Sequence, residues 1–438
     1  MIGDAPELAC AHLFGVEYPD YYRWYTGEGM RSILLCQQCF EQPEQRAGTL
    51  RQVCRACFER VEEDGCLEAV GGMPQVLERA TSLRFTHRDL ALPADLLGDV
   101  LVIAPLLGEA HSAWVALTSW GALVRLDLGA GTAQTLARLP QGALDLAAPL
   151  SLHIAPDGRA AAVANTYGSS GRVVDLASGA VTMELDRKKY HVDVCQFPLG
   201  FFMHGGRLLL IHATDWNRLD VSDPLTGELL TPRAYEKPEP TSDKQVQPEH
   251  YLDYFHAGLH VSPDGRWVAD AGWVWHPVGI VRTWSLADWL GQNPWESEDG
   301  ASERRLTYAH YLWDSPMCWV GDSTLAIWGV GADEEVMLPA VLLFDVPSST
   351  PTRAFGGPQV APHSGWPPRV SRLGWLAYDR WLFAISPECG TGVWDVATGE
   401  RLHHAADFAP TAYHSGARQF LTVLPGGALR LSALEGEA

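Results

Sequence analysis

The chain has 438 residues, of which 47% are hydrophobic and 19% are charged, so it has ample apolar material for a large folded body. Its net charge of −21 argues against nucleic acid as a general partner, because binding phosphates through counterion release requires a basic surface. No stretch reaches the roughly 20 consecutive apolar residues of a membrane span, and the first residues lack the basic and apolar regions of a secretory signal. We therefore expect no contact with a membrane.

 The expected location is the bacterial cytoplasm.

The first 66 residues contain six of the nine cysteines, and four of them form two closely spaced pairs, Cys36-Gln37-Gln38-Cys39 and Cys54-Arg55-Ala56-Cys57. In a reducing compartment such clustering favours metal ligation over disulfides. The pairs can present four thiolates tetrahedrally to one ion, which suits Zn²⁺. We therefore predict a structural Zn²⁺ held by Cys36, Cys39, Cys54 and Cys57, with no open position for catalysis. The alternative is that one pair is redox-active or merely buried.

Three further candidate ligands, Cys10, His12 and Cys66, are left over. They predict a second metal site completed by one unidentified group, or else a buried Cys10, a hydrogen-bonded His12 and an inert Cys66. The order CxH…CxxC…CxxC loosely resembles the start of ubiquitin-hydrolase-type zinc fingers, which open with a Cys-x-His-Leu. The resemblance ends at Cys57, because the later histidine ligands of that family have no counterpart before residue 80, and ubiquitin binding is not carried over.

An aromatic run, residues 18–25, lies between these cysteines and includes Trp24. In so small a domain the run is typical of core packing, but an exposed Trp24 would be an interaction hot spot. The following stretch, Leu67 to Ala80, is expected to form a short helix or a linker. We place the boundary of this zinc-ribbon-like module at residue 80.

A short phrase with a central Asp or Ser recurs seven times after the module, at steps of 48, 45, 65, 60, 50 and 37 residues. These steps centre on the roughly 40–50 residues of a four-stranded propeller blade. The repeats predict an all-β fold, a seven-bladed β-propeller over residues 81–438. The central residues of the phrase are Asp127, Asp175, Asp220, Ser285, Asp345, Asp395 and Ser432.

The repeats resemble those of WD40-type and related bacterial propellers, although only Trp394-Asp395 preserves the WD dipeptide. The resemblance implies that the Asp of each phrase anchors a turn through backbone N–H groups. The last copy has room for only three strands, which would leave an unpaired edge. We therefore expect a strand at about 82–90 to close the ring beside Leu429–Leu434.

Two long steps between repeats predict insertions, at about 231–256 and 287–312. Their aromatic residues indicate a protein-recognition surface on rigid loops, or else a cover for a blade edge. The candidate contact residues in these insertions are Tyr254, Phe255, Trp289 and Trp295.

The sequence contains no Walker-type, nucleophile-elbow or HExxH motif. It favours a non-enzymatic interaction scaffold, a subunit of a cytosolic complex that binds protein partners through rim loops, the zinc module or both. The alternative is an enzyme or small-molecule sensor with its site in the central channel, which requires polar side chains from several inner strands to converge. Recognition of single-stranded nucleic acid by the zinc module is disfavoured by the local acidity.

Overall fold

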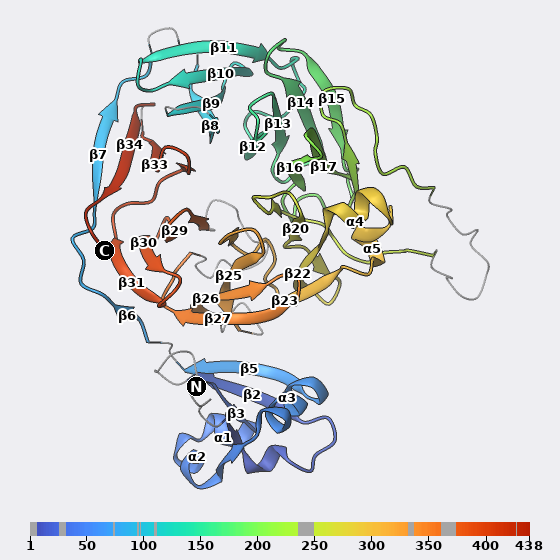
Figure 1. Cartoon of the computed structure of the whole chain (residues 1–438), viewed down its shortest axis with the longest axis vertical. Helices are drawn as coiled ribbons and strands as arrows, with labels where there is room; N and C mark the ends of the chain where they lie inside the picture. Colours follow the sequence, from blue (N-terminus) through green and yellow to red (C-terminus); the bar gives the residue numbers. More distant parts are fainter. Residues whose placement is uncertain are drawn as a thin grey trace.

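The computed structural model describes residues 7–25, 32–72, 75–93, 96, 98–108, 112–234, 249–331, 337–360, 374–425 and 427–438. The chain forms a ring of seven sheets with a smaller sheet-and-helix module beside it (Figure 1). None of the helices in these ranges is long and apolar enough to cross a bilayer.

The N-terminal module is a five-stranded sheet with strand order β4-β1-β3-β2-β5. Helix α3 packs Phe58 and Val61 against Ala9 and Leu34 of the sheet and against Leu13 of the short helix η1. The elements are β1 (Glu7–Cys10), the 3-10 helix η1 (Ala11–Leu13), β2 (Asp20–Tyr25), β3 (Ser32–Leu35), α1 (Gln37–Glu41), α2 (Pro43–Thr49), β4 (Leu50–Val53), α3 (Arg55–Asp64) and β5 (Cys66–Gly72).

The stretch from Leu67 differs from the helix or linker expected for it. Its first part belongs to β5, which pairs in parallel with β2. The alternation of half-buried and exposed residues along Cys66–Val70 fits a strand at a sheet edge. Further on, β6 (Leu77–Glu78) pairs with β31 of the propeller.

The propeller is built from seven antiparallel sheets, most of four strands. Blades 1 to 3 comprise β8 (Val100–Pro105), β9 (Ala113–Thr118), β10 (Ala122–Asp127), β11 (Thr132–Arg138); β12 (Leu150–Ile154), β13 (Ala160–Asn165), β14 (Ser170–Asp175), β15 (Val181–Asp186); and β16 (Leu199–His204), β17 (Arg207–Asp215), β18 (Arg218–Ser222). Blades 4 and 5 comprise β19 (Leu259–Val261), β20 (Trp267–Asp270), β21 (Trp273–Val274), β22 (Val278–Ser285), β23 (Arg304–His310); and β24 (Met317–Trp319), β25 (Thr324–Val330), β26 (Leu338–Asp345), β27 (Thr350–Gly356). Blades 6 and 7 comprise β28 (Trp375–Tyr378), β29 (Leu382–Ser386), β30 (Gly390–Asp395), β31 (Glu400–Ala405); and β32 (Ala412–His414), β33 (Gln419–Val423), β34 (Leu429–Glu435), completed by β7 (Arg84–Leu90).

Strand β7 supplies the outer strand of blade 7, so that an early and a late segment share one sheet (Figure 1). It runs antiparallel to β34, with Leu90 opposite Leu429 and Arg84 opposite Glu435. The Phe85 ring lies 4.6 Å from the Phe408 ring, between centroids. The pairing removes the exposed edge that a three-stranded last blade would present.

The Asp of the repeated phrase anchors a turn in several blades. Asp127 accepts hydrogen bonds from the N–H groups of Gly129 and Ala130, and Asp175 accepts one from Ala177. In blade 3 this role belongs to Asp223, whose Oδ1 accepts from two backbone N–H groups, while Asp220 lies within β18. The phrase there is thus three residues out of step with the turn that it was expected to mark.

The two expected insertions differ in what they contain. Residues 235–248 of the first lie outside the described ranges. The second contains α4 (Leu286–Gly291), which Ser285 caps, then α5 (Glu296–Asp299) and β23, the outer strand of blade 4.

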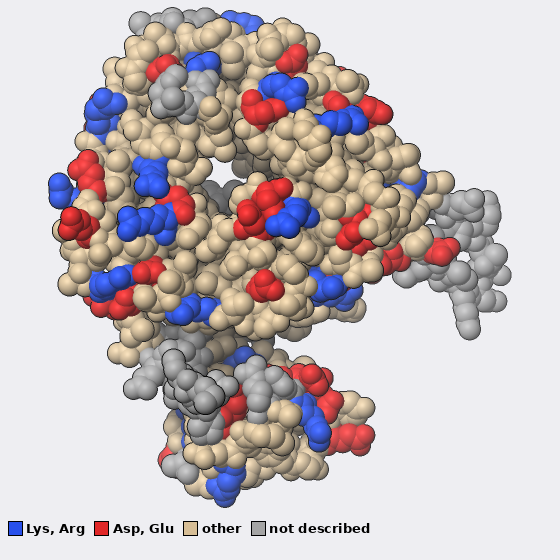
Figure 2. Space-filling model, in the orientation of Figure 1, with Lys and Arg blue, Asp and Glu red and all other residues tan. Residues whose placement is uncertain are grey.

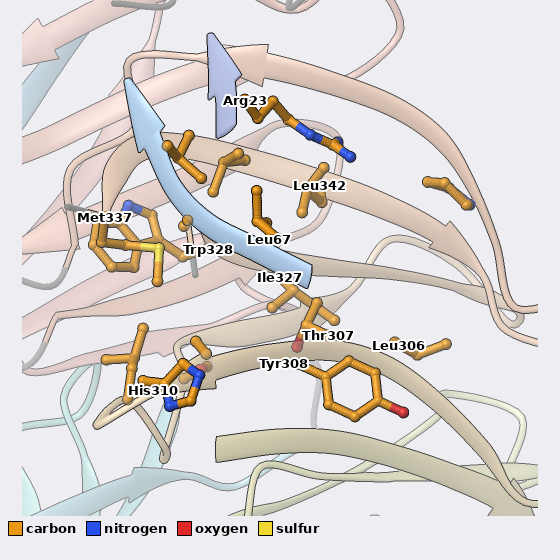
Figure 3. A pocket seen from close by; sticks show the side chains of 18 of the residues that line it. Arg23, Leu67, Leu306, Thr307, Tyr308, His310, Ile327, Trp328, Met337 and Leu342 are labelled. Atoms are coloured by element: carbon orange, nitrogen blue, oxygen red, sulfur yellow. The ribbon is translucent and has the colours of Figure 1, made fainter. Parts of the chain in front are cut away.

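The module rests against blade 5 through a small shared apolar cluster. Tyr25 and Val70 of the module pack with Val330 and Ala340 of the propeller. Beside this contact is a cavity of about 640 Å³ between the two domains. Figure 3 shows Arg23 and Leu67 on the module side, with Tyr308 and His310 on the propeller side.

Candidate metal centre and interaction surface

Four side chains from two neighbouring segments meet in the N-terminal module: Cys10, His12, Cys36 and Cys39. Cys10 ends β1, and His12 follows in η1. Cys36 is the residue before α1, and Cys39 lies within that helix. The parallel pairing of β1 with β3 brings the two segments together, because both strands finish at the same end of the sheet.

The separations between these ligand atoms fit a tetrahedral metal site. The Cys10 Sγ lies 3.6 Å from the Sγ of Cys36 and 3.6 Å from that of Cys39. The His12 Nδ1 lies 3.3 Å from the Cys36 Sγ and 3.7 Å from the Cys39 Sγ. Tetrahedral bonds of the lengths usual for zinc place two sulfurs about 3.8 Å apart, and a sulfur and a nitrogen about 3.6 Å apart. The cluster can therefore hold one metal ion through three thiolates and an imidazole.

Cys39 is buried and its helix is held by polar contacts. Burial raises the pKa of Cys39 to about 11, so a bound cation must displace the proton of this thiol. The Thr49 hydroxyl lies 3.2 Å from the Cys39 Sγ. Arg46 donates hydrogen bonds to the carbonyl oxygens of Cys39 and Phe40, which fixes the helix that carries the ligand.

The ligand set brought together by the structure differs from the one predicted from the two CxxC pairs. Cys36 and Cys39 lie with Cys10 and His12, whereas Cys54 and Cys57 lie outside the cluster, at the start of α3. Cys66 also lies outside it and begins β5. The CxxC spacing identified the two pairs, but it could not show which pair lies beside Cys10 and His12 in the folded chain.

Most of the aromatic residues expected to contact partners are packed inside the protein. Tyr254, Phe255 and Trp289 are each 1% exposed and belong to the propeller interior, so they cannot present their rings to a partner. Trp295 is half-buried and stacks on His250. Trp24 is also half-buried, with the Arg46 guanidinium 3.7 Å from its ring centroid. The sequence does not reveal which of the aromatic rings in these loops turn inward.

Aromatic side chains, most of them exposed, lie over these buried rings on the loop after β15 and beside blade 4. We call this group the aromatic surface and define it as Tyr190, His191, Trp275 and Tyr311. Tyr190, Trp275 and Tyr311 are 47%, 41% and 43% exposed. The His191 ring lies 4.5 Å from Tyr190 and 5.0 Å from Trp275, between centroids. Tyr311 is joined to the same turn, because its N–H donates to the Pro277 carbonyl.

The aromatic surface has a rigid base. Beneath it Phe255, Trp273 and Trp313 stack in series, with centroid distances of 4.2 and 4.9 Å. The backbone at His191 and Tyr311 has φ values of 50° and 58°, a conformation that residues other than Gly rarely adopt. The fold therefore holds exposed rings in place at a cost in backbone strain, an arrangement that is concentrated at functional sites.

A cavity of about 320 Å³ lies next to the aromatic surface, and Trp216 joins the two. The Trp216 ring lies 5.4 Å from Tyr190 and also lines the cavity. Trp295 and Glu298 line its other side, where Glu298 pairs with Arg233. Trp295 is thus an expected contact residue that lines this cavity.

Buried polar groups in the propeller bear on the alternative of a channel site. The His256 Nδ1 lies 2.6 Å from an oxygen of the Asp270 carboxylate, but both residues are buried within the protein. His153 and His260 lie on the inner strands β12 and β19, and burial lowers the pKa of each to about 4. Both imidazoles are therefore neutral near pH 7, and both side chains are half-buried on these inner strands.

The face shown in Figure 2 has acidic and basic side chains interspersed over the described residues, around an opening at the centre of the propeller. No continuous basic area covers the described part of this face. On this face the distribution agrees with the acidic overall charge and offers no continuous basic path for a nucleic-acid backbone.

No protein-family model matches the sequence, and no curated protein matches it. Among solved structures, the chain is similar to one from the "Crystal Structure of Mitotic Checkpoint Complex", with 12% identity and a TM-score of 0.46. That match covers 78% of this chain and 92% of the other. The assignment of a seven-bladed propeller rests on the order of strands within the sheets and on the closing strand described above.

Proposed function

We propose that this chain is a protein-interaction scaffold of a cytosolic complex, with its main docking site at the aromatic surface. The observation that carries the proposal is the exposure of Tyr190, Trp275 and Tyr311 above a closely packed aromatic layer. Trp and Tyr in such rigid settings dominate the binding energy of protein interfaces. A partner gains affinity there without having to order the loops first.

The N-terminal module supports this role as a folded appendage, with Zn²⁺ as the proposed ion. Three thiolates and one imidazole match the preference of zinc for soft ligands in a closed tetrahedral site. Four protein ligands leave no open position for water, so the proposed role of the ion is structural. The module then offers a second surface, fixed to blade 5 by Tyr25 and Val70.

The docking site is tested by affinity capture from the native host with wild-type protein and two single variants. In Trp275→Ala the aromatic surface loses its largest ring, while Trp120→Ala removes a Trp on blade 1 that is 61% exposed. We expect partners captured by wild type and by Trp120→Ala to bind Trp275→Ala on the order of thirtyfold more weakly, the effect of a hot-spot residue.

The affinity of each recovered partner is then measured by titration with purified proteins. Equal affinities for Trp275→Ala and wild type would contradict docking at the aromatic surface. A circular dichroism spectrum and zinc content equal to wild type show that Trp275→Ala is folded, so that a loss of binding is assigned to the surface itself.

A further inference from the structure

Cys54 and Cys57 form a close pair of exposed thiols at the start of α3. Their Sγ atoms are 3.2 Å apart. Cys54 is the residue that caps the helix, and its Sγ accepts a hydrogen bond from the Cys57 N–H at 3.4 Å. Both side chains are exposed to solvent. A reagent can therefore reach either sulfur without local unfolding.

This pair has a different environment from the metal cluster. Among the described residues, no His, Cys, Asp or Glu adds a third ligand atom to it within the distance that defines the Cys10 cluster. Two thiolates occupy only half of a tetrahedral zinc sphere. Within the part of the chain that the structure describes, the two sulfurs are thus left to each other.

The two thiols are also unequal. The contact between the two thiols and the backbone N–H that Cys57 donates lower the pKa of Cys54. The same thiol contact, together with the neighbouring Cys54 charge, raises the pKa of Cys57. One sulfur is therefore favoured as the attacking thiolate, and its neighbour is held as the second thiol, the division of labour found in CxxC redox motifs.

We propose that Cys54 and Cys57 form a thiol–disulfide exchange site that is oxidised by the disulfide of a small thiol. The Cys54 thiolate attacks one sulfur of the disulfide, forms a mixed disulfide and releases one thiolate, which takes up a proton. Cys57 loses its proton and attacks the Cys54 Sγ, which releases the second thiolate. In sum, two protein thiols become one disulfide and the reagent is reduced to two thiols. The sulfurs approach from 3.2 Å to a bond of about 2.05 Å.

The experiment uses the full-length, zinc-loaded chain and glutathione disulfide as the probe. Remaining thiols are alkylated at successive times and located by peptide mass mapping. We expect Cys54 and Cys57 to be lost together, in a peptide lighter by two hydrogens, while Cys36, Cys39 and the zinc content stay unchanged. The exposed Cys66 is the control within the same chain, since it has no cysteine beside it and can form only a mixed disulfide.

Two variants separate the roles of the pair. In Cys57→Ser, a glutathione adduct is expected to accumulate on Cys54, because the resolving thiol is absent. In Cys54→Ser, the adduct on Cys57 should form on the order of tenfold more slowly, because its thiol is less ionised. Zinc content equal to wild type shows that each variant keeps its folded module.

Other outcomes overturn the proposal. If the wild-type chain binds a second equivalent of zinc that protects Cys54 and Cys57 from alkylation, the pair is a metal site. If stable adducts form on both sulfurs of the wild type without a disulfide, the pair does not exchange as a unit. A disulfide that forms only after denaturation also rejects the site.

Discussion

The N-terminal module and the propeller are stabilised in different ways. The module has a small apolar core. Beside it, the two segments that follow the paired strands β1 and β3 bring together the side chains of Cys10, His12, Cys36 and Cys39. The propeller instead repeats one sheet seven times and ties its last blade to an early strand through main-chain hydrogen bonds. A small domain depends on a few strong links, because it cannot bury enough apolar surface on its own. A repeated fold distributes its stability over many weaker contacts between neighbours.

Replacing a ligand of the metal cluster tests this difference most strongly. In Cys39→Ala we expect the bound metal to be lost and the module to unfold, because the free energy of structural zinc sites, about 10–16 kcal/mol in peptides, exceeds the usual stability of a small domain. The measurements are the metal content per chain and limited proteolysis, in which residues 1–80 should be cut while the propeller resists.

Two further variants decide which cysteines hold the ion. Cys66→Ala is the matched control and should keep the metal content of wild type. Loss of the metal in Cys54→Ala, together with full metal content in a variant that lacks Cys10, would instead support the set of Cys36, Cys39, Cys54 and Cys57 that the two CxxC pairs predict.

The sequence predicted much of the module's chemistry but not its geometry. Clustered cysteines indicated a metal, and all four members of the structural cluster were among the candidate ligands. Which cysteines meet depends on the parallel pairing of β1 with β3, between segments more than twenty residues apart. A CxxC spacing carries no information about such a long-range pairing. A helix or linker was expected where the structure has strand β5, because this short run of residues shows no clear hydrophobic periodicity.

A buried acid in the propeller should give a pH-dependent effect that the module does not share. Burial raises the pKa of Asp314 to about 7, despite hydrogen bonds from the N–H groups of Gly258 and Gln196 and the nearby charge of Arg187. Since the folded protein holds this proton more tightly than the unfolded chain, the contribution of Asp314 to stability falls as pH rises from about 4 to about 7. Above pH 7 the contribution is constant.

The variant Asp314→Asn cannot titrate but keeps an oxygen for both backbone donors. Its free energy of unfolding, relative to wild type, should therefore rise across this window by up to about 4 kcal/mol, the value of roughly three pKa units. Urea unfolding at several pH values measures the difference. A difference that stays constant between pH 4 and pH 7 would show that Asp314 has no raised pKa in the folded protein.

The closing strand can be weakened without touching the module. Phe85 of β7 packs on Phe408 and Phe420, so Phe85→Ala should destabilise the propeller by about 2–3 kcal/mol while the metal content stays unchanged. Arg88→Ala, on the exposed side of the same strand, is the control and should change stability by less than about 0.5 kcal/mol. If both variants unfold at the same urea concentration, β7 does not hold the ring closed through this contact.

The propeller was predictable because its information is local and repeated. Pro156-Asp157-Gly158 has the backbone conformation that a hairpin turn requires, since Gly158 has a φ of 72° and donates its N–H to the Ala155 carbonyl. The aromatic surface was not predicted: Tyr311 lies at the edge of the expected insertion 287–312, but Tyr190, His191 and Trp275 lie outside both insertions. Tyr254 and Phe255 face inward while Trp275 faces outward, and nothing in the composition of an aromatic loop distinguishes these orientations.

The repeated Asp provides the smallest effect, within a single blade. Asp175 accepts hydrogen bonds from the Ala177 N–H and the Ser178 hydroxyl, so Asp175→Ala leaves one turn of blade 2 without its anchor. We expect a loss of about 1 kcal/mol, the usual cost of removing a side chain that caps backbone N–H groups, measured by urea unfolding. Asp175→Asn keeps the accepting oxygen and should recover most of that loss. The stability of the ring is distributed over contacts between neighbouring blades. A loss of unfolding free energy as large as that expected for Phe85→Ala would therefore mean that a single turn controls the stability of the ring.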